Sequence, residues 1–194
     1  SKVNTVGPIF NLDKLNWLNG HYIRELEPRD FAARILPFLV ADGVLPEQPS
    51  LPQLGRLNLV AELIQTRINL LSEATPLVAP FFTDDAELPI ADDARAQLKE
   101  TAPQVLDAAI AALEPISGSL GKPDGTGIEW VHERIEAALR EAVVDGLGIK
   151  PKFAFGPLRT AVSGQRISPP LFESMEILGK HSTMERLKNL RASL

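Results

Sequence analysis

The sequence predicts an all-α fold, with two packed helical subdomains preceded by a short N-terminal segment. Along most of the 194-residue chain, apolar residues recur at the three- and four-residue spacing of helices. The two-residue alternation that is typical of strands is almost absent. Proline, glycine and helix-capping residues punctuate the apolar stretches, which predicts mostly short helices.

The first helices are expected between residues 29 and 76. Over 29–40 apolar residues recur at helical spacing, and Pro37 within this stretch predicts a kink or an early stop. A longer apolar stripe covers 54–74, and Pro76 ends it. These two stretches predict the helices of the first subdomain.

A second helical block is expected over 92–113, where Pro103 divides the pattern in two. The following stretch, 114–127, is rich in glycine and proline and predicts a surface loop. Thr126 and Glu129 have the spacing of a capping box, which predicts the start of the next helix.

Three short helices are predicted in the last third of the chain. Pro157 suits the first turn of a helix that ends at Gly164. Ser168 is a candidate N-cap for the next helix, which would stop at Gly179. Ser182 begins a further capping-box pattern, so the third helix is expected to start there.

The expected domain organisation follows from these stretches. Residues 1–28 form the N-terminal segment, 29–95 the first helical subdomain and 96–194 the second. The seam between the two subdomains is expected between residues 86 and 101.

The composition excludes several classes of chemistry. Because there is no cysteine, disulfides, cysteine nucleophiles and zinc–thiolate sites are excluded. The 3 histidines are widely spaced, which argues against a histidine-built metal site. No glycine-rich phosphate loop and no nucleophile elbow occurs in the sequence. These absences favour a binding module without a catalytic residue, metal or cofactor of its own.

Hydropathy argues against a membrane partner. No apolar run approaches the length of about 18 residues that a membrane span requires. The first residues do not have the pattern of a signal peptide. We therefore expect a soluble, cytoplasmic protein.

Charge is distributed unevenly along the chain, whose formal net charge is -5. Residues 1–147 hold 12 Lys/Arg against 22 Asp/Glu, whereas 148–194 hold 8 against 3. A positive segment on an acidic body can bind a polyanion locally. On charge alone, a solvated basic tail is the simpler interpretation.

Two regions of the chain carry a specific resemblance. The first is 13–24, with the sequence DKLNWLNGHYIR. The second comprises GPLRTAVSG at 156–164, SPPLFE at 168–173 and ILGK at 177–180. In this order and spacing, the chain resembles the C-terminal half of bacterial glutamyl-tRNA synthetases. The resemblance spans essentially the whole chain, although 83–125 matches only in helical character.

The resemblance implies a fold and a role. In that family the first motif ends the stem-contacting region, and the second lies in a helical cage that binds the anticodon. The family's catalytic domain, with its HIGH and KMSKS type signatures, would precede Ser1, and neither signature is present here. The whole enzyme would join glutamate to tRNA(Glu) with ATP and Mg²⁺. This fragment would bind tRNA, without DNA or a membrane as partner, and perform no chemistry.

Four residues match family positions that contact anticodon bases: Arg159, Ser168, Pro169 and Leu171. An arginine fork can bond to a base edge or stack on it. A hydroxyl at a helix start, with stiff prolines beside it, can present a polar contact. Candidate phosphate contacts are Lys150, Lys152, Arg166 and Lys180.

Each candidate has a structural alternative. Arg159 can equally be a surface residue that pairs with an acidic neighbour. Ser168 can be only a helix cap, and Leu171 can belong to the core. Trp17 and Tyr22 can be base-stacking platforms, but their apolar surroundings favour packing in the core.

One departure from the family pattern bears on specificity. Family members that accept only tRNA(Glu) often have an arginine just before an aromatic pair, where it reads the third anticodon base. Here the corresponding stretch, 77–82, lacks arginine, and there is none between Arg67 and Arg95. An enzyme that also charges tRNA(Gln) is therefore one hypothesis. The other is that Arg67 or another side chain supplies the contact.

Two rival functions remain open at this stage. The first is a helical protein-interaction module, which suits the acidic first 147 residues. The second is a free-standing RNA-binding relative without any role in charging tRNA. The sequence that precedes Ser1 in the natural protein would separate them from a synthetase.

Overall fold

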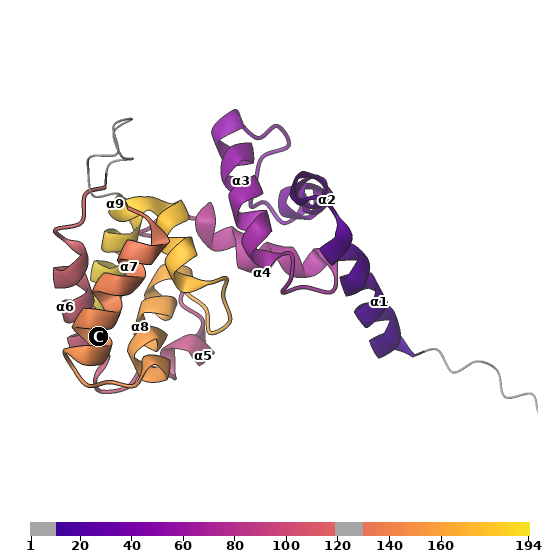
Figure 1. The fold of residues 1–194 in the computed structure, drawn as a ribbon. Helices are drawn as coiled ribbons and strands as arrows, with labels where there is room; N and C mark the ends of the chain where they lie inside the picture. Colours follow the sequence, from indigo (N-terminus) through magenta and orange to yellow (C-terminus); the bar gives the residue numbers. More distant parts are fainter. Residues whose placement is uncertain (1–10, 119–129) are drawn as a thin grey trace, which may run out of the picture.

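A computed structural model describes residues 11–118 and 130–194 (Figure 1). All the regular structure in these ranges is helical, which confirms the all-α prediction. The α-helices are α1 (Leu12–Glu25), α2 (Pro28–Ala41), α3 (Leu51–Ile64), α4 (Ala74–Val78), α5 (Asp92–Arg95), α6 (Ala102–Leu113), α7 (His132–Leu139), α8 (Pro151–Ser163) and α9 (Leu171–Ala192). Shorter helical turns are η1 (Leu71–Glu73), η2 (Ala79–Phe81) and the π-helical η3 (Arg140–Asp145).

Helix α1 projects from the rest of the molecule (Figure 1). Its N-cap is Asn11, whose side chain accepts a hydrogen bond from the backbone N–H of Lys14. At its other end the Gln65 amide donates to the carbonyls of Ile23 and Leu26, at 2.8 and 2.7 Å. Because Gln65 follows α3, this buried side chain joins the end of α1 to the first group of helices.

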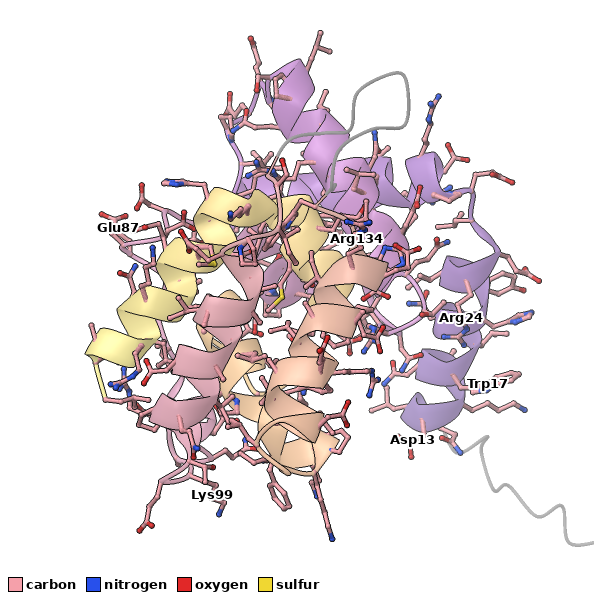
Figure 2. All side chains as sticks on the ribbon, turned by 60° about the vertical axis from the view of Figure 1, so that its left-hand side comes forward. Asp13, Trp17, Arg24, Glu87, Lys99 and Arg134 are labelled. Atoms are coloured by element: carbon pink, nitrogen blue, oxygen red, sulfur yellow. The ribbon has the colours of Figure 1, made fainter. Side chains whose placement is uncertain are left out.

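Helix α1 has large exposed aromatic side chains. Trp17 and Tyr22 are 63% and 60% exposed, and Figure 2 shows Trp17 pointing away from the body of the molecule. Our expectation that both rings pack in the core is therefore wrong for the described residues. The reason is that α1 projects from the rest of the molecule, so that only Gly20 and Ile23 of this helix are buried.

The first group of helices comprises α2, α3 and α4, which pack on one another. Pro37 lies inside α2, which continues to Ala41, so the early stop did not occur. Ser50 and Gln53 form a capping box that starts α3. The apolar stripe over 54–74 is interrupted, because α3 ends at Ile64 and the chain turns before the short helices η1 and α4.

The second group comprises α6, α7, α8 and α9, with α9 in contact with the other three. Both groups share one hydrophobic core, to which Phe31 and Ile64 contribute from the first and Leu158 and Leu187 from the second. The predicted domain boundaries at 28/29 and 95/96 stay predictions.

Helix α8 differs from the expectation at its start. It begins at Pro151, so Pro157 lies in its interior rather than in its first turn. It ends at Gly164, as predicted, with a positive φ of 69°. A Cβ on Gly164 would collide with the carbonyl oxygen of Pro89, and the Gly164 carbonyl accepts from the backbone N–H of Ala91. Glycine is therefore required there by both conformation and contact.

Helix α9 also differs. Its N-cap is Pro170, so Ser168 does not cap it. Gly179 ends the first helical segment of α9, as predicted, because its φ of 82° and ψ of 165° are not helical. A second segment follows this kink and continues to Ala192. Ser182, predicted to cap that segment, already lies inside it.

Two further expectations concern the region before α7. The predicted capping box at Thr126 and Glu129 and most of the predicted loop lie outside the described residues. From α7 into η3, Ile135, Leu139 and Val143 recur at four-residue spacing and are fully buried. Within the described ranges, no helix could span a membrane.

Candidate nucleic-acid interface

Arg159 lies on α8 with its side chain half-buried. Its guanidinium makes no hydrogen bond or ion pair with any described residue, while its backbone carbonyl accepts from the Ser163 hydroxyl at 2.9 Å. The acidic neighbour that our structural alternative required is therefore absent from the part of the chain that the structure describes.

A second arginine lies near Arg159. Burial lowers the pKa of Arg159, and the positive charge of Arg67 lowers that pKa further. Arg67 is exposed in the turn that follows α3, so the two cations come from different groups of helices. Two positive charges that act on each other favour an anion nearby.

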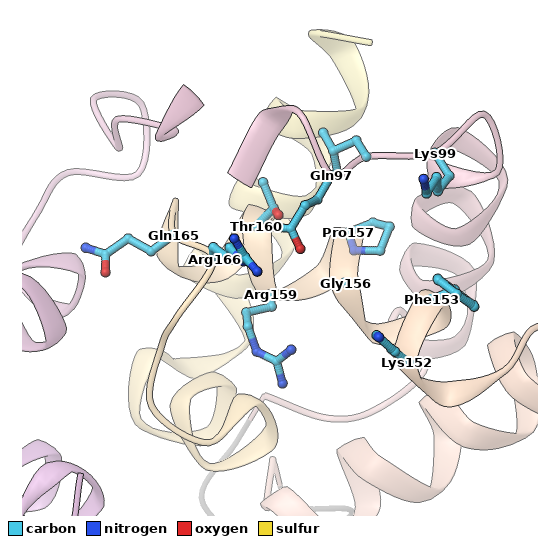
Figure 3. Close-up of a pocket in the computed structure, with 11 residues that line it drawn as sticks. Gln97, Lys99, Lys152, Phe153, Gly156, Pro157, Arg159, Thr160, Gln165 and Arg166 are labelled. Atoms are coloured by element: carbon cyan, nitrogen blue, oxygen red, sulfur yellow. The ribbon is translucent and has the colours of Figure 1, made fainter. Parts of the chain in front are cut away.

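Arg159 lines a cavity of about 170 Å³ between α8, the lead-in to α6 and the loop after α8 (Figure 3). Its eleven lining residues include four cations and no carboxylate: Lys99, Lys152, Arg159 and Arg166. None of these four side chains has a hydrogen bond or ion pair with the described residues. In a chain with a net charge of -5, such a cluster marks the place where a polyanion can bind.

The candidate phosphate contacts divide into two sets. Lys152 and Arg166 line the cavity beside Arg159. Lys150 is exposed at the N-cap of α8 but does not line the cavity. Lys180 lies elsewhere, because its ammonium donates to the carbonyl of Glu114 at 2.6 Å and so caps the end of α6.

The remaining predicted base contacts are buried. The hydroxyl of Ser168 donates to the carbonyl of Pro169 at 3.1 Å, and both residues are buried. Leu171 is only 6% exposed and belongs to the hydrophobic core, as its structural alternative stated. A direct base contact by Ser168, Pro169 or Leu171 stays a prediction.

Two residues of the cavity were missed by reasoning from the sequence. Lys99 lies in a stretch that was expected to be helical, more than fifty residues from α8, and no local pattern connects it with Arg159. Phe153 is 48% exposed in the first turn of α8. In the sequence, the only sign of a role for Phe153 was that it is an aromatic residue directly after the basic Lys152.

Comparison with known families gives a specific match. A family model described as the anticodon binding domain matches residues 30–191. The glutamate–tRNA ligase of Kineococcus radiotolerans is 48% identical over 192 residues, which cover 99% of this chain and 36% of that protein. The enzyme of the same name from Kocuria rhizophila is 50% identical over 185 residues, covering 95% and 34%. The chain thus spans about a third of the length of these curated relatives.

Solved structures agree on the fold. A crystal structure of a glutamate tRNA ligase from Elizabethkingia meningosepticum superposes with a TM-score of 0.74 at 16% identity. The superposition covers 100% of this chain and 34% of that one. At this identity the likeness shows the fold alone. Because the family model matches well over half of the sequence, the chain belongs to the anticodon binding domain family, as its resemblance to glutamyl-tRNA synthetases predicted.

Proposed function

We propose that this chain binds the anticodon loop of a tRNA, and that Arg159 makes the central contact. The cavity around Arg159 is the observation that carries the proposal, because it is lined by four cations that have no ion-pair partner within 11–118 and 130–194, and none of the lining residues in these ranges is acidic. Membership of the anticodon binding domain family supports the same class of ligand. A phosphate or a base acceptor would offset the repulsion between Arg159 and Arg67.

A single-stranded loop suits this cavity better than a double helix. Unpaired bases can be splayed out and bonded along their edges, whereas the bases of an A-form duplex are hidden in a deep, narrow groove. The half-buried guanidinium of Arg159 has no hydrogen-bond or ion-pair partner among the described residues, so it can bond to a base edge or stack on a base.

The likeness to glutamate–tRNA ligases extends the proposal to a whole enzyme. We place this chain in a cytoplasmic protein that joins glutamate to tRNA(Glu) in translation. In this proposal ATP and Mg²⁺ act in a catalytic domain outside these 194 residues. The anticodon contact would orient the tRNA, so that binding energy far from the reaction contributes to it.

Arg67 is the candidate reader of the third anticodon base. The stretch that matches the family's arginine position ends in Phe81 and Phe82 and contains no arginine. Arg67 supplies a positive charge close to Arg159 from the same group of helices as these aromatic residues. If neither Arg67 nor another side chain reads this base, a relaxed enzyme that also charges tRNA(Gln) follows.

The test is a titration of the chain with a stem-loop that carries the glutamate anticodon, with the glutamine anticodon stem-loop alongside. Arg159→Ala should weaken binding of the glutamate stem-loop by about 1–3 kcal/mol, as expected for an arginine that reads a base. Arg67→Ala should reduce the preference for the glutamate over the glutamine anticodon. Arg134→Ala, an exposed arginine on α7 outside the cavity lining, is the matched control and should bind as the wild type does.

The outcomes separate the alternatives. Equal and weak binding of both stem-loops, unchanged by Arg159→Ala, would contradict anticodon reading and favour a protein-interaction module. Strong binding of both stem-loops that depends on Arg159 but not on Arg67 would support the relaxed enzyme. Circular dichroism of each variant checks that the helices are intact.

A further inference from the structure

Phe153 differs from the other aromatic side chains of the second helix group. Trp130 is buried and donates its indole N–H to the carbonyl of Met175 at 2.7 Å. Phe155 packs edge-on against Phe172, and the guanidinium of Arg140 lies over its ring. Phe153 is 48% exposed and has no ring or cation–π partner among the described residues.

The position of Phe153 brings its ring to the cationic cavity. Phe153 lines the cavity together with Lys99 and Lys152, at the end away from Arg166 (Figure 3). One turn further along α8, Gly156 also lines the cavity, and no atom lies within 4 Å of the place where its Cβ would be. The absence of a side chain at Gly156 therefore leaves open space in the cavity lining that an incoming group can enter.

An exposed ring changes what the cavity can recognise. Lysine and arginine side chains hold any polyanion, since they bind phosphates without regard to the bases. A phenyl ring has no charge and no hydrogen-bonding group, so it adds nothing to phosphate binding. It offers a stacking surface, which every nucleobase can use, and proteins that bind single strands combine such rings with cationic grooves.

We propose that Phe153 is a stacking platform for an unpaired base of the RNA loop, with Lys99 and Lys152 on its phosphates. This proposal rests on the proposed function. Phe153 and Arg159 are six residues apart on one helix, which corresponds to about 9 Å along its axis. Stacked bases are about 3.4 Å apart along a strand. The base on Phe153 is therefore a different nucleotide from the one at Arg159, two or three positions away.

The experiment places 2-aminopurine, a fluorescent base that is quenched when it stacks, at successive loop positions of the glutamate stem-loop. With the wild-type chain, 2-aminopurine should be quenched on binding at one loop position. This position should lie two or three nucleotides from the one at which the fluorescence change on binding is lost in Arg159→Ala. Phe153→Leu keeps an apolar side chain but removes the ring, and it should abolish this quenching. It should also weaken binding at least fivefold, the lower bound for the loss of one base–aromatic stack.

Salt dependence separates stacking from charge. Phe153→Leu should weaken binding by the same factor at every salt concentration, whereas Lys152→Gln should lower the slope of log Kd against log salt by about 1. Phe153→Trp keeps an aromatic ring and should retain binding and quenching. Phe38→Leu, at a ring 38% exposed on α2, is the matched control and should change nothing.

The results distinguish this proposal from the proposed function. If Phe153→Leu binds and quenches as the wild type does while Arg159→Ala weakens binding, stacking is overturned and anticodon binding stands. If the wild-type chain does not bind the stem-loop at all, both are overturned. If Phe153→Trp is as weak as Phe153→Leu, the effect of the substitution is not due to the aromatic ring, and stacking is again overturned.

Discussion

The side chain of Arg186 crosses from α9 to the segment that joins the two groups of helices. Only 2% of the side chain is exposed, and its Nε donates to the Asp85 carboxylate at 2.5 Å. Its two terminal nitrogens donate to the carbonyls of Val162 and Thr83, at 2.7 and 3.0 Å. Every partner of this buried charge therefore comes from the chain itself, and the side chain is not available to an RNA.

Replacing Arg186 by methionine should destabilise the protein by about 3–5 kcal/mol. The substitution leaves the Asp85 carboxylate and two carbonyls without their donor, which is the costly way to break a buried pair. Urea unfolding followed by circular dichroism measures the change. Arg191→Met is the control, because Arg191 pairs with Asp107 at the exposed surface, and it should leave the midpoint nearly unchanged. Equal effects of the two variants would contradict this account.

His132 begins α7 and is held by a carboxylate from α9. Its Nδ1 lies 2.6 Å from an Oε2 of Glu176, which also accepts from the His132 backbone N–H at 2.8 Å. This hydrogen bond raises the pKa of His132, and the charges of Glu133, Glu176 and Glu173 raise it further, against a smaller opposing effect of burial. Protonated His132 is therefore favoured in the folded protein.

The sign of the pH effect follows from the raised pKa of His132. The stability that the protonated ring contributes is fully present below its unfolded pKa of about 6.5. It is lost as pH rises through the higher pKa of the folded state. Because the side chain is 39% exposed, the contribution is small, below about 1 kcal/mol.

We expect the difference in unfolding free energy between the wild type and His132→Gln to shrink as pH rises from 5.5 to 8.5. Urea titrations at several pH values measure this difference. The backbone hydrogen bond to Glu176 remains in both proteins, so the comparison isolates the ring. A constant difference over the whole pH range would show that protonation of His132 does not contribute.

At the scale of the element, the kink in α9 joins three parts of the second helix group. Gly179 leaves the helical conformation there, between Met175 and Thr183. The carbonyl of Met175, before the kink, accepts from the indole N–H of Trp130 at 2.7 Å and from the hydroxyl of Thr183, beyond the kink, at 3.3 Å. One carbonyl thus joins the residues before α7 to both segments of α9.

Gly179→Ala and Gly55→Ala should change stability in opposite directions. No atom lies within 4 Å of a Cβ built at either position, so sterics between residues do not enter. At Gly179 the φ of 82° and ψ of 165° suit glycine alone, and alanine should cost about 1–3 kcal/mol. At Gly55, inside α3, alanine is the better helix former and should gain up to about 1 kcal/mol.

Thermal and urea unfolding of the two glycine variants give the comparison directly. If Gly55→Ala lowered stability as much as Gly179→Ala, backbone conformation would not explain the effect of the Gly179 substitution. A neutral Gly179→Ala would mean that α9 straightens at little cost.

At the scale of the whole molecule, charge is segregated. The chain carries 25 acidic against 20 basic residues, yet the cavity at Arg159 has four cations and no acidic lining residue. An acidic body repels an extended polyanion, while a local cluster of cations attracts the part of it that reaches the cavity. Binding should therefore depend on a flexible loop of the nucleic acid that can reach the cavity, rather than on a run of phosphate charges along a rigid backbone.

A double-stranded DNA of 20 base pairs, in tenfold excess, should leave the bound fraction of the glutamate stem-loop unchanged. The measurement is a competition titration at 0.15 M salt, where exposed charges further apart than about 8 Å are largely screened. Unlabelled stem-loop is the positive control and should displace the labelled one. Displacement by the duplex would indicate binding through phosphate charge alone.

Much of the candidate site was visible in the sequence. Arg159, Lys152 and Arg166 were singled out from one short region, and the structure brings all three to one cavity. Lys99 was missed because its place beside α8 depends on how the lead-in to α6 packs. Ser168 was expected as a cap on the basis of residue type and the following prolines, but the helix begins only after Pro170.

The sequence by itself determined the all-α class and the family, because helical periodicity and the motifs over 13–24 and 156–180 are properties of neighbouring residues. Only the tertiary structure decided which charges line the candidate cavity. Lys99 and Arg159 both line it, whereas Arg186 is buried and bonded to three partners. The physical reason is that a local pattern sets which face of a helix is apolar. The neighbours of a charge are decided by how distant helices pack.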